Sequence, residues 1–122
     1  MMNMSNTTFI DKGTSSKVKI NLDGTHNEVG HADLAIINMS SDIIGTATID
    51  IIANGAEDDF SSQVTFKVFD LEGNLEFMAN NSNHGISEFI HEVSNFICKD
   101  EDTTSKILDE VSIRIAASAQ YE

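Results

Sequence analysis

Residues 63–79, QVTFKVFDLEGNLEFMA, predict a β-hairpin, and the expected fold is built outward from it. Apolar and polar side chains alternate on both sides of its centre, which is typical of strands with one buried face. Between the two alternating runs stand Asp70, Leu71, Glu72 and Gly73, which suit a type I turn because glycine accepts the positive φ at its end. The stretch therefore predicts two antiparallel strands of a sheet.

A four-residue loop predicts the register of this hairpin. Lys67 then faces Glu76 on one side of the sheet, an opposite-charge pair worth roughly 0.2–1 kcal/mol. A three-residue loop would instead set Val68 against Glu76, and so place a charge opposite the apolar side. We therefore expect the four-residue loop, in which the apolar side holds the pairs Val68–Leu75, Phe66–Phe77 and Val64–Ala79.

Three stretches before the hairpin also predict strands. The run from about His31 to Met39 ends almost wholly apolar, which is typical of a central strand covered on both faces. Ile43–Ala53 alternates, and Gly45 inside it suggests a bulge or a close crossing. The first stretch, Lys17–Leu22, alternates cleanly. Its inward-facing residues are expected to be Val18, Ile20 and Leu22.

The period of the apolar residues changes after residue 85. Apolar side chains now recur at intervals of three and four, which predicts an amphipathic helix over about 86–97. The sheet is the surface available to cover its apolar stripe, so we expect the helix to pack across one sheet face. The stripe consists of Ile86, Phe89, Ile90, Val93, Phe96 and Ile97.

The last segment, residues 107–117, fits two patterns. Ile107, Leu108, Val111 and Ile115 suit a second helix, whereas alternation and β-branched residues favour a strand from about residue 110 to 117. We favour the strand. The expected fold class is α+β and mainly β: an antiparallel sheet or β-sandwich of five to six short strands, with one helix packed on one face.

Residues 1–16 are mostly polar, and after the methionines Phe9 and Ile10 form an apolar pair. They predict an N-terminal arm or tail, followed by one globular domain over residues 17–122. The segment is either a disordered tail or an arm that docks on a neighbouring subunit. In the second case Phe9 and Ile10 would contact the neighbour, and Lys12, Lys17 and Lys19 would lie against its acidic body.

The net charge is −13 over 122 residues, and residues 41–122 hold sixteen acidic but only four basic side chains. This balance disfavours direct binding to nucleic acid, whose phosphates attract Lys and Arg. It suits a soluble chain, a basic partner or mimicry of nucleic acid. The sequence has neither a signal-peptide pattern nor a run of roughly 20 apolar residues. We therefore expect no membrane contact and a cytoplasmic or virion-associated location.

No catalytic or metal-binding motif stands out, so we expect no catalytic residue, cofactor or metal. Cys98, the single cysteine, follows an apolar helix stripe and is expected to be a half-buried structural thiol. His91 with Glu88 and Glu92 could hold a loose cation or act as an acid–base group. A solvated polar helix face explains these three residues more simply, because the sequence implies no further ligand.

The leading hypothesis is a non-enzymatic subunit that acts through protein–protein contacts with copies of itself or with a basic protein, as phage virion proteins and assembly adaptors do. The alternative is an acidic inhibitor that mimics nucleic acid, as anti-restriction and anti-CRISPR proteins do. An enzyme or small-ligand binder with its site between helix and sheet is the third. The strand-then-helix order resembles the layout of SecB-like export chaperones, although this chain lacks proline. The expected contact residues are Phe9, Ile10, Lys12, Lys17, Lys19, Glu57, Asp58, Asp59, Asp100, Glu101 and Asp102.

Overall fold

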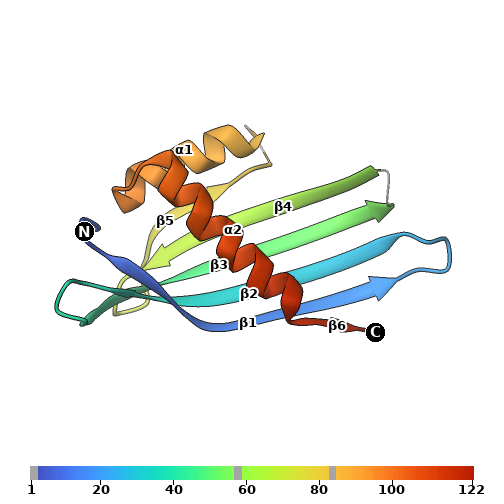
Figure 1. Ribbon diagram of the computed structural model, residues 1–122, viewed down its shortest axis with the longest axis horizontal. Helices are drawn as coiled ribbons and strands as arrows, with labels where there is room; N and C mark the ends of the chain where they lie inside the picture. Colours follow the sequence, from blue (N-terminus) through green and yellow to red (C-terminus); the bar gives the residue numbers. More distant parts are fainter. Residues whose placement is uncertain (1–2, 57–58, 83–84) are drawn as a thin grey trace.

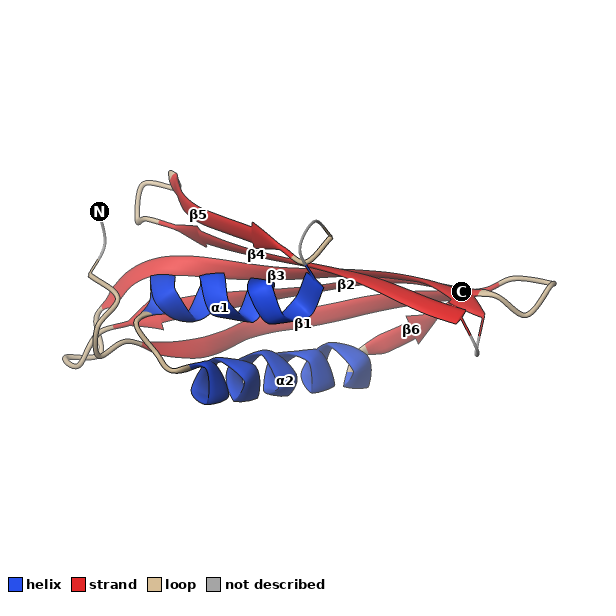
Figure 2. Ribbon diagram, turned by 90° about the horizontal axis from the view of Figure 1, so that it is seen from above, coloured by secondary structure: helices blue, strands red, loops and turns tan. Residues whose placement is uncertain are grey.

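The computed structural model describes residues 3–56, 59–82 and 85–122, and it consists of one six-stranded sheet with two helices packed against it (Figures 1 and 2). The strand order is β5-β4-β3-β2-β1-β6. Neighbouring strands from β1 to β5 are antiparallel, and β6 is parallel to β1. The expected mainly β, α+β class is therefore confirmed, as a single sheet. The elements are β1 (Thr8–Ile20), β2 (His26–Ile37), β3 (Ile43–Ala56), β4 (Asp59–Phe69), β5 (Leu75–Asn80), α1 (Gly85–Ile97), α2 (Glu101–Ala117) and β6 (Ala119–Tyr121).

The hydrophobic core lies between the helices and one face of the sheet. Phe66 is 2% exposed, and its ring packs edge-on against Phe9 and Phe77 at centroid distances of 6.3 and 6.2 Å. Phe77 in turn stacks on Phe96 of α1 at 4.4 Å. The sheet alternation and the helical stripe thus meet in one apolar layer, and the expected helix over about 86–97 is confirmed.

The first strand corrects the expectation for the N-terminus. Thr8–Ile20 pairs with β2 along its whole length, so the boundary expected between residues 16 and 17 falls inside one strand. A bulge between Asp11 and Gly13 interrupts the register, and the Asp11 side chain accepts a hydrogen bond of 2.8 Å from the Gly13 N–H. Backbone pairing with β2 orders this polar stretch, because each strand N–H and C=O needs a partner.

Two of the three residues expected to face inward on the strand predicted over Lys17–Leu22 are exposed. Val18 is buried as expected, but Ile20 is 53% exposed and Leu22 is fully exposed. The hairpin projects past the helices, as Figure 1 shows at the right-hand side of the view. The alternation therefore correctly assigned Ile20 to the helix side of the sheet, but neither α1 nor α2 extends far enough to cover it.

The hairpin predicted from residues 63–79 forms, but its two strands pair in a different register from the expected one. The Asp70 N–H donates to the Asn74 carbonyl at 3.0 Å, and the Asn74 N–H donates to the Asp70 carboxylate at 2.8 Å. The loop between them therefore has three residues, with Gly73 at φ 85°. A register shift at Glu76 then restores the apolar side. The resulting pairs are Phe69–Leu75, Val68–Phe77, Lys67–Met78 and Phe66–Ala79, so the expected Lys67–Glu76 pair is absent.

The last segment is a helix, so the strand expected over 110–117 is wrong. The helix α2 begins after Asp100, whose side chain accepts a 2.7 Å hydrogen bond from the Thr103 N–H as an N-cap. Val111 and Ile115, one turn apart, are both 1% exposed and face the sheet. The short β6 follows and pairs with Ser16–Val18 of β1. Burial of this one apolar stripe outweighs the β-branched character of the segment.

Two features of the middle strands were expected. The second strand is central, between β1 and β3, and a register shift occurs next to Gly45: Ile36 pairs with Gly45 and Ile37 with Ile43. The expectation that β2 is covered on both faces is wrong, because both helices lie over the same face. We refer to that side as the covered face and to the other as the uncovered face.

Candidate functional site: the uncovered face of the sheet

The uncovered face carries a large share of the exposed apolar side chains. Because paired residues share a face and successive residues alternate, the strand register assigns each side chain to one face. Thirteen large hydrophobic residues are exposed in the described part of the chain, and six of them lie on this one face. They are Ile10, Val29, Ile43, Ile52, Leu75 and Met78.

Most of these residues lie near one end of the strands, where β1, β3 and β5 begin and β2 and β4 end. One cross-strand row there reads Ile10, Ala35, Thr46, Phe69 and Leu75 from β1 to β5. Such cross-strand neighbours touch along a face because adjacent strands lie only about 4.8 Å apart. We define the apolar band as Ile10, Ala35, Ile37, Ile43, Phe69, Leu75 and Met78.

A polar row crosses the same face further along the strands, and His31 lies at its centre. The His31 Nδ1 atom is 2.6 Å from Asp50 Oδ1 on β3, and its Nε2 atom is 2.9 Å from Asp33 Oδ1 on its own strand. Where the row reaches the edge strand β5, the Asn80 amide donates a hydrogen bond of 2.6 Å to the Thr65 hydroxyl of β4. The row consists of Ser15, His31, Asp50, Thr65 and Asn80.

The two carboxylates favour the charged form of His31. The hydrogen bond that His31 donates to Asp50 raises the pKa of His31, partial burial opposes the change, and Asp33 adds to the rise. A protonated ring satisfies both carboxylates at once, because both of its nitrogens then donate. Neither nitrogen is left free to take a proton from a substrate, so the arrangement is that of a cross-strand clamp between β2 and β3.

The same three side chains do not surround a common point, because Asp33 and Asp50 bind opposite nitrogens of the ring. Within the part of the chain that the structure describes, no group of three His, Cys, Asp or Glu residues could hold a metal ion. Over the same residues, no helix combines the length and apolar character that a membrane span requires.

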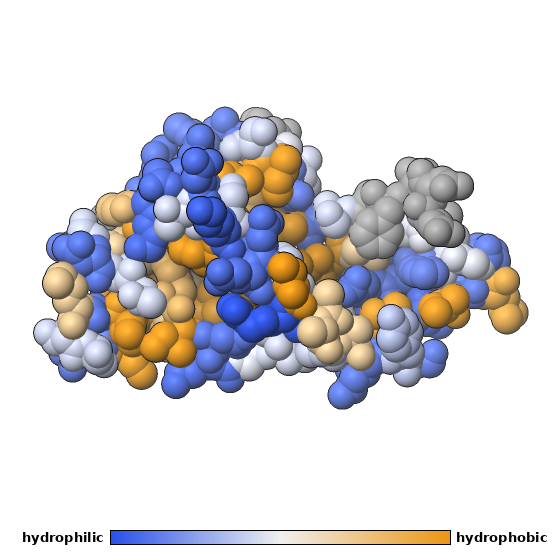
Figure 3. Space-filling model, viewed as in Figure 1, coloured by the Kyte–Doolittle hydropathy of each residue, from blue (hydrophilic) through white to orange (hydrophobic). Residues whose placement is uncertain are grey.

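The charge of the uncovered face differs from that of the whole chain. Lys17 and Lys19 on β1 and Lys67 on β4 lie on this face, together with Asp33 and Asp50. These three lysines and two aspartates lie together on one face of a chain of net charge −13. Residues 85–117, which form the helix layer, hold seven acidic and three basic side chains. Much of the excess acid therefore lies away from the uncovered face, and Figure 3 shows hydrophilic side chains over the helix layer.

The structure divides the five contact residues expected at the N-terminus among different surfaces. Phe9 points to the covered face and packs on Phe66 in its own chain, so it is not available to a neighbour. Ile10, the next residue, joins the apolar band and is 41% exposed. Lys17 and Lys19 lie on the uncovered face, whereas Lys12 is exposed in the bulge of β1.

The acidic residues expected at a contact surface do not come together among those that the structure describes. Asp100 caps α2, and Glu101 and Asp102 occupy its first turn, where carboxylates interact favourably with the helix dipole. Asp59 begins β4, and the starts of β4 and α2 lie at opposite ends of the molecule (Figure 1). Glu57 and Asp58 lie outside the described residues.

Two other predictions concern the end of α1. Cys98 is exposed rather than half-buried, because it takes a left-handed φ of 59° just after the helix. His91 does have an acidic partner, but the partner is Glu101 at 3.0 Å, across the turn between the helices. Both side chains are more than half exposed, so this pair is a surface contact.

The His31 clamp was not foreseen from the sequence. His31 and Asp33 are two residues apart in a strand and so share a face, which the sequence pattern could have revealed. The third member, Asp50, reaches the cluster through the pairing of His31 with Asp50 across β2 and β3, which depends on the register.

Comparison with known proteins assigns no class beyond this architecture: no family model, no curated protein and no solved structure matches the chain. The functional question therefore depends on the geometry of the uncovered face.

Proposed function

We propose that the protein is a non-enzymatic subunit that associates with a second copy of itself, and that the uncovered faces of the two sheets form the contact. The observation that carries this proposal is the apolar band, a group of apolar side chains, four of them large and exposed, on a face over which the described part of the chain places no helix. Large exposed apolar patches on soluble proteins mark interaction sites.

The charges support a second copy as the partner. Two copies with a net charge of −13 each repel one another through most of their surfaces. The uncovered face is the exception, because its three lysines and two aspartates offer both signs. A strongly basic partner would find more carboxylates on the helix layer than on this face.

The geometry supports face-to-face packing. Two sheets that pack face to face lie about 10 Å apart and bury their inner side chains between them. A twofold axis would bring the apolar band of one copy onto that of the other, which is the usual closed symmetry of dimers. This contact replaces the docking arm considered above, because residues 8–16 are part of β1.

The oligomeric state tests the proposal. We expect the full chain to be a dimer in size-exclusion chromatography with light scattering at physiological salt. The double variant Ile43→Lys, Leu75→Lys should weaken dimerisation at least about 100-fold, since burial of each such side chain contributes roughly 1.5–3 kcal/mol. Both residues are about half exposed, at 49% and 54%, so the fold should tolerate the change.

The matched control is Ile86→Lys, Ile113→Lys, which places the same residues on the helix layer. These isoleucines are 53% and 68% exposed, and both double variants remove the same amount of net negative charge. The control should remain dimeric. A monomeric full chain at micromolar concentration, or equal dissociation of both double variants, would rule the proposal out.

A further inference from the structure

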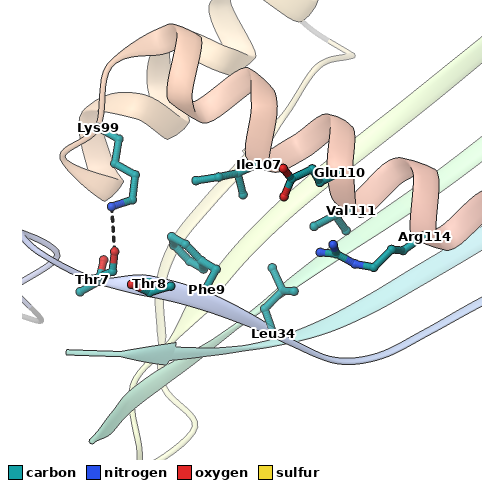
Figure 4. Close-up of a pocket in the computed structure, with 9 residues that line it drawn as sticks. All are labelled: Thr7, Thr8, Phe9, Leu34, Lys99, Ile107, Glu110, Val111 and Arg114. Atoms are coloured by element: carbon teal, nitrogen blue, oxygen red, sulfur yellow. Dashed lines mark hydrogen bonds between the residues drawn. The ribbon is translucent and has the colours of Figure 1, made fainter. Parts of the chain in front are cut away.

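A cavity of about 300 Å³ lies between α2 and the N-terminal part of β1 (Figure 4). It is on the covered side of the sheet, so it is separate from the proposed dimer contact. Phe9 and Leu34 lie along its sheet side, and Ile107 and Val111, one turn apart on α2, lie along its helix side. The middle of the cavity is therefore apolar.

Lys99 stands at one end of this cavity, with its ammonium group turned toward β1 (Figure 4). The Nζ atom donates a hydrogen bond of 2.8 Å to the carbonyl oxygen of Thr7. That acceptor is neutral and uses one of the three N–H groups of the ammonium. No carboxylate among the described residues forms an ion pair with Lys99, so its charge is half-buried and without a counter-ion.

The far end of the cavity is already neutralised. Arg114 lines it, but the Arg114 Nε atom is paired with Asp11 Oδ2 at 2.6 Å. Glu110 also lines the cavity and would repel a second anionic group near α2. The lining therefore has a positive charge without a counter-ion at Lys99, an apolar wall leading away from it, and the carboxylate of Glu110 on the helix side.

We propose that this cavity binds a small monocarboxylate with an apolar tail, of the chemistry of a medium-chain fatty acid. The carboxylate accepts hydrogen bonds from the Lys99 ammonium, and the tail lies between Phe9 and Leu34 on one side and Ile107 and Val111 on the other. The ligand supplies the counter-ion that Lys99 lacks and fills the apolar space behind it.

Calorimetric titration of the full chain with three probes tests the ligand class. Octanoate carries both the carboxylate and the tail, octanol has the tail alone, and acetate has the charge alone. We expect octanoate to bind, and each of the other two to bind at least about tenfold more weakly, because hydrogen bonds to charged groups are the strong ones. Octanol binding as tightly as octanoate, or no octanoate binding, would overturn the proposal.

Two variants of the cavity lining test whether octanoate binds in this cavity. Lys99→Met should weaken octanoate at least about tenfold, whereas Lys106→Met, on the exposed side of α2, should leave it unchanged. Ile107→Ser shortens the apolar wall and leaves Lys99 and Thr7 intact, so it provides a second route to the same loss. Circular dichroism verifies that each variant is folded. Full octanoate affinity in folded Lys99→Met, or in folded Ile107→Ser, would overturn the assignment.

The site and the dimer contact can be separated. The variant Ile43→Lys, Leu75→Lys changes only the uncovered face, so it should bind octanoate as the unmodified chain does. Loss of octanoate binding in that variant would place the ligand on the uncovered face and overturn the assignment to the cavity.

Discussion

The two faces of the sheet obey the same alternation but have different surroundings. Ile49 and Ile52 lie three residues apart on β3, on opposite faces, and are 1% and 45% exposed. Ile49 packs under the helices, whereas Ile52 lies on the face that no described helix covers. The alternation along a strand therefore divides its residues between two faces, and the elements that pack over each face decide which one becomes the core.

The largest expected difference between the faces concerns two phenylalanines of β4. Phe66→Ala removes a ring that is 2% exposed and contacts two other rings, so it should lower the free energy of unfolding by about 3–5 kcal/mol. Phe69→Ala, on the uncovered face, should cost about 1 kcal/mol. Urea denaturation at low protein concentration measures both, before association contributes. Equal losses of unfolding free energy in the two variants would mean that the two faces of the sheet are buried to the same extent.

A smaller effect is expected where α2 approaches the sheet. A Cβ atom added to Gly30 would lie 2.5 Å from Cγ2 of Ile115, a buried branched side chain with little room to move. Gly30→Ala should therefore destabilise the protein by about 1–3 kcal/mol.

The neighbouring residue supplies the matched control for Gly30. Val29 lies on the uncovered face and is 60% exposed, so Val29→Ala should change the stability by less than about 0.5 kcal/mol. Thermal unfolding of the two variants compares the faces at adjacent positions. A neutral Gly30→Ala would show that α2 can move away from the sheet at no cost.

The smallest expected effect is the pH dependence of the His31 clamp. Asp50, and to a lesser degree Asp33, raises the pKa of His31. The clamp therefore stabilises the fold fully below the unfolded pKa of 6.5, and this contribution is lost as the pH rises through the higher folded value. The stability lost in Asp50→Asn should thus be greater at about pH 5.5 than at about pH 8.

Urea titrations at the two pH values measure that difference. The effect should be small, because His31 and Asp50 are 38% and 43% exposed and water screens their interaction. His26→Asn is the control, since His26 is exposed at the start of the same strand. A loss in Asp50→Asn that stays constant between the two pH values would contradict the clamp.

Several elements of the fold could be predicted because each depends on neighbours in the chain. The stripe from Ile86 to Ile97 repeats at the helical period, and the helix α1 follows it. The alternation around Phe66 and Phe77 places both rings on the side that became the core. Gly45 indicated the irregularity between β2 and β3. Each of these patterns depends on residues that are close together in the sequence, so it can be recognised without knowing the tertiary structure.

The hairpin register could not be predicted, because two irregularities act together. The three-residue loop would by itself turn the apolar side of β5 over, and the shift at Glu76 turns it back. Considered alone, a three-residue loop conflicts with the apolar pattern. Only the whole hairpin, packed under α1 through Phe77 and Phe96, resolves this conflict.

By itself the sequence determined the mainly β composition, the amphipathic helix and the two sides of each central strand, because these follow from the spacing of neighbouring residues. The tertiary structure decided which side is covered, why residues 8–16 are a strand, and why residues 101–117 are a helix. Each of these depends on a partner distant in the chain: β2 supplies hydrogen bonds to β1, and the sheet supplies the surface that buries Val111 and Ile115. The uncovered face and the Lys99 cavity, on which both proposals depend, belong to that second group.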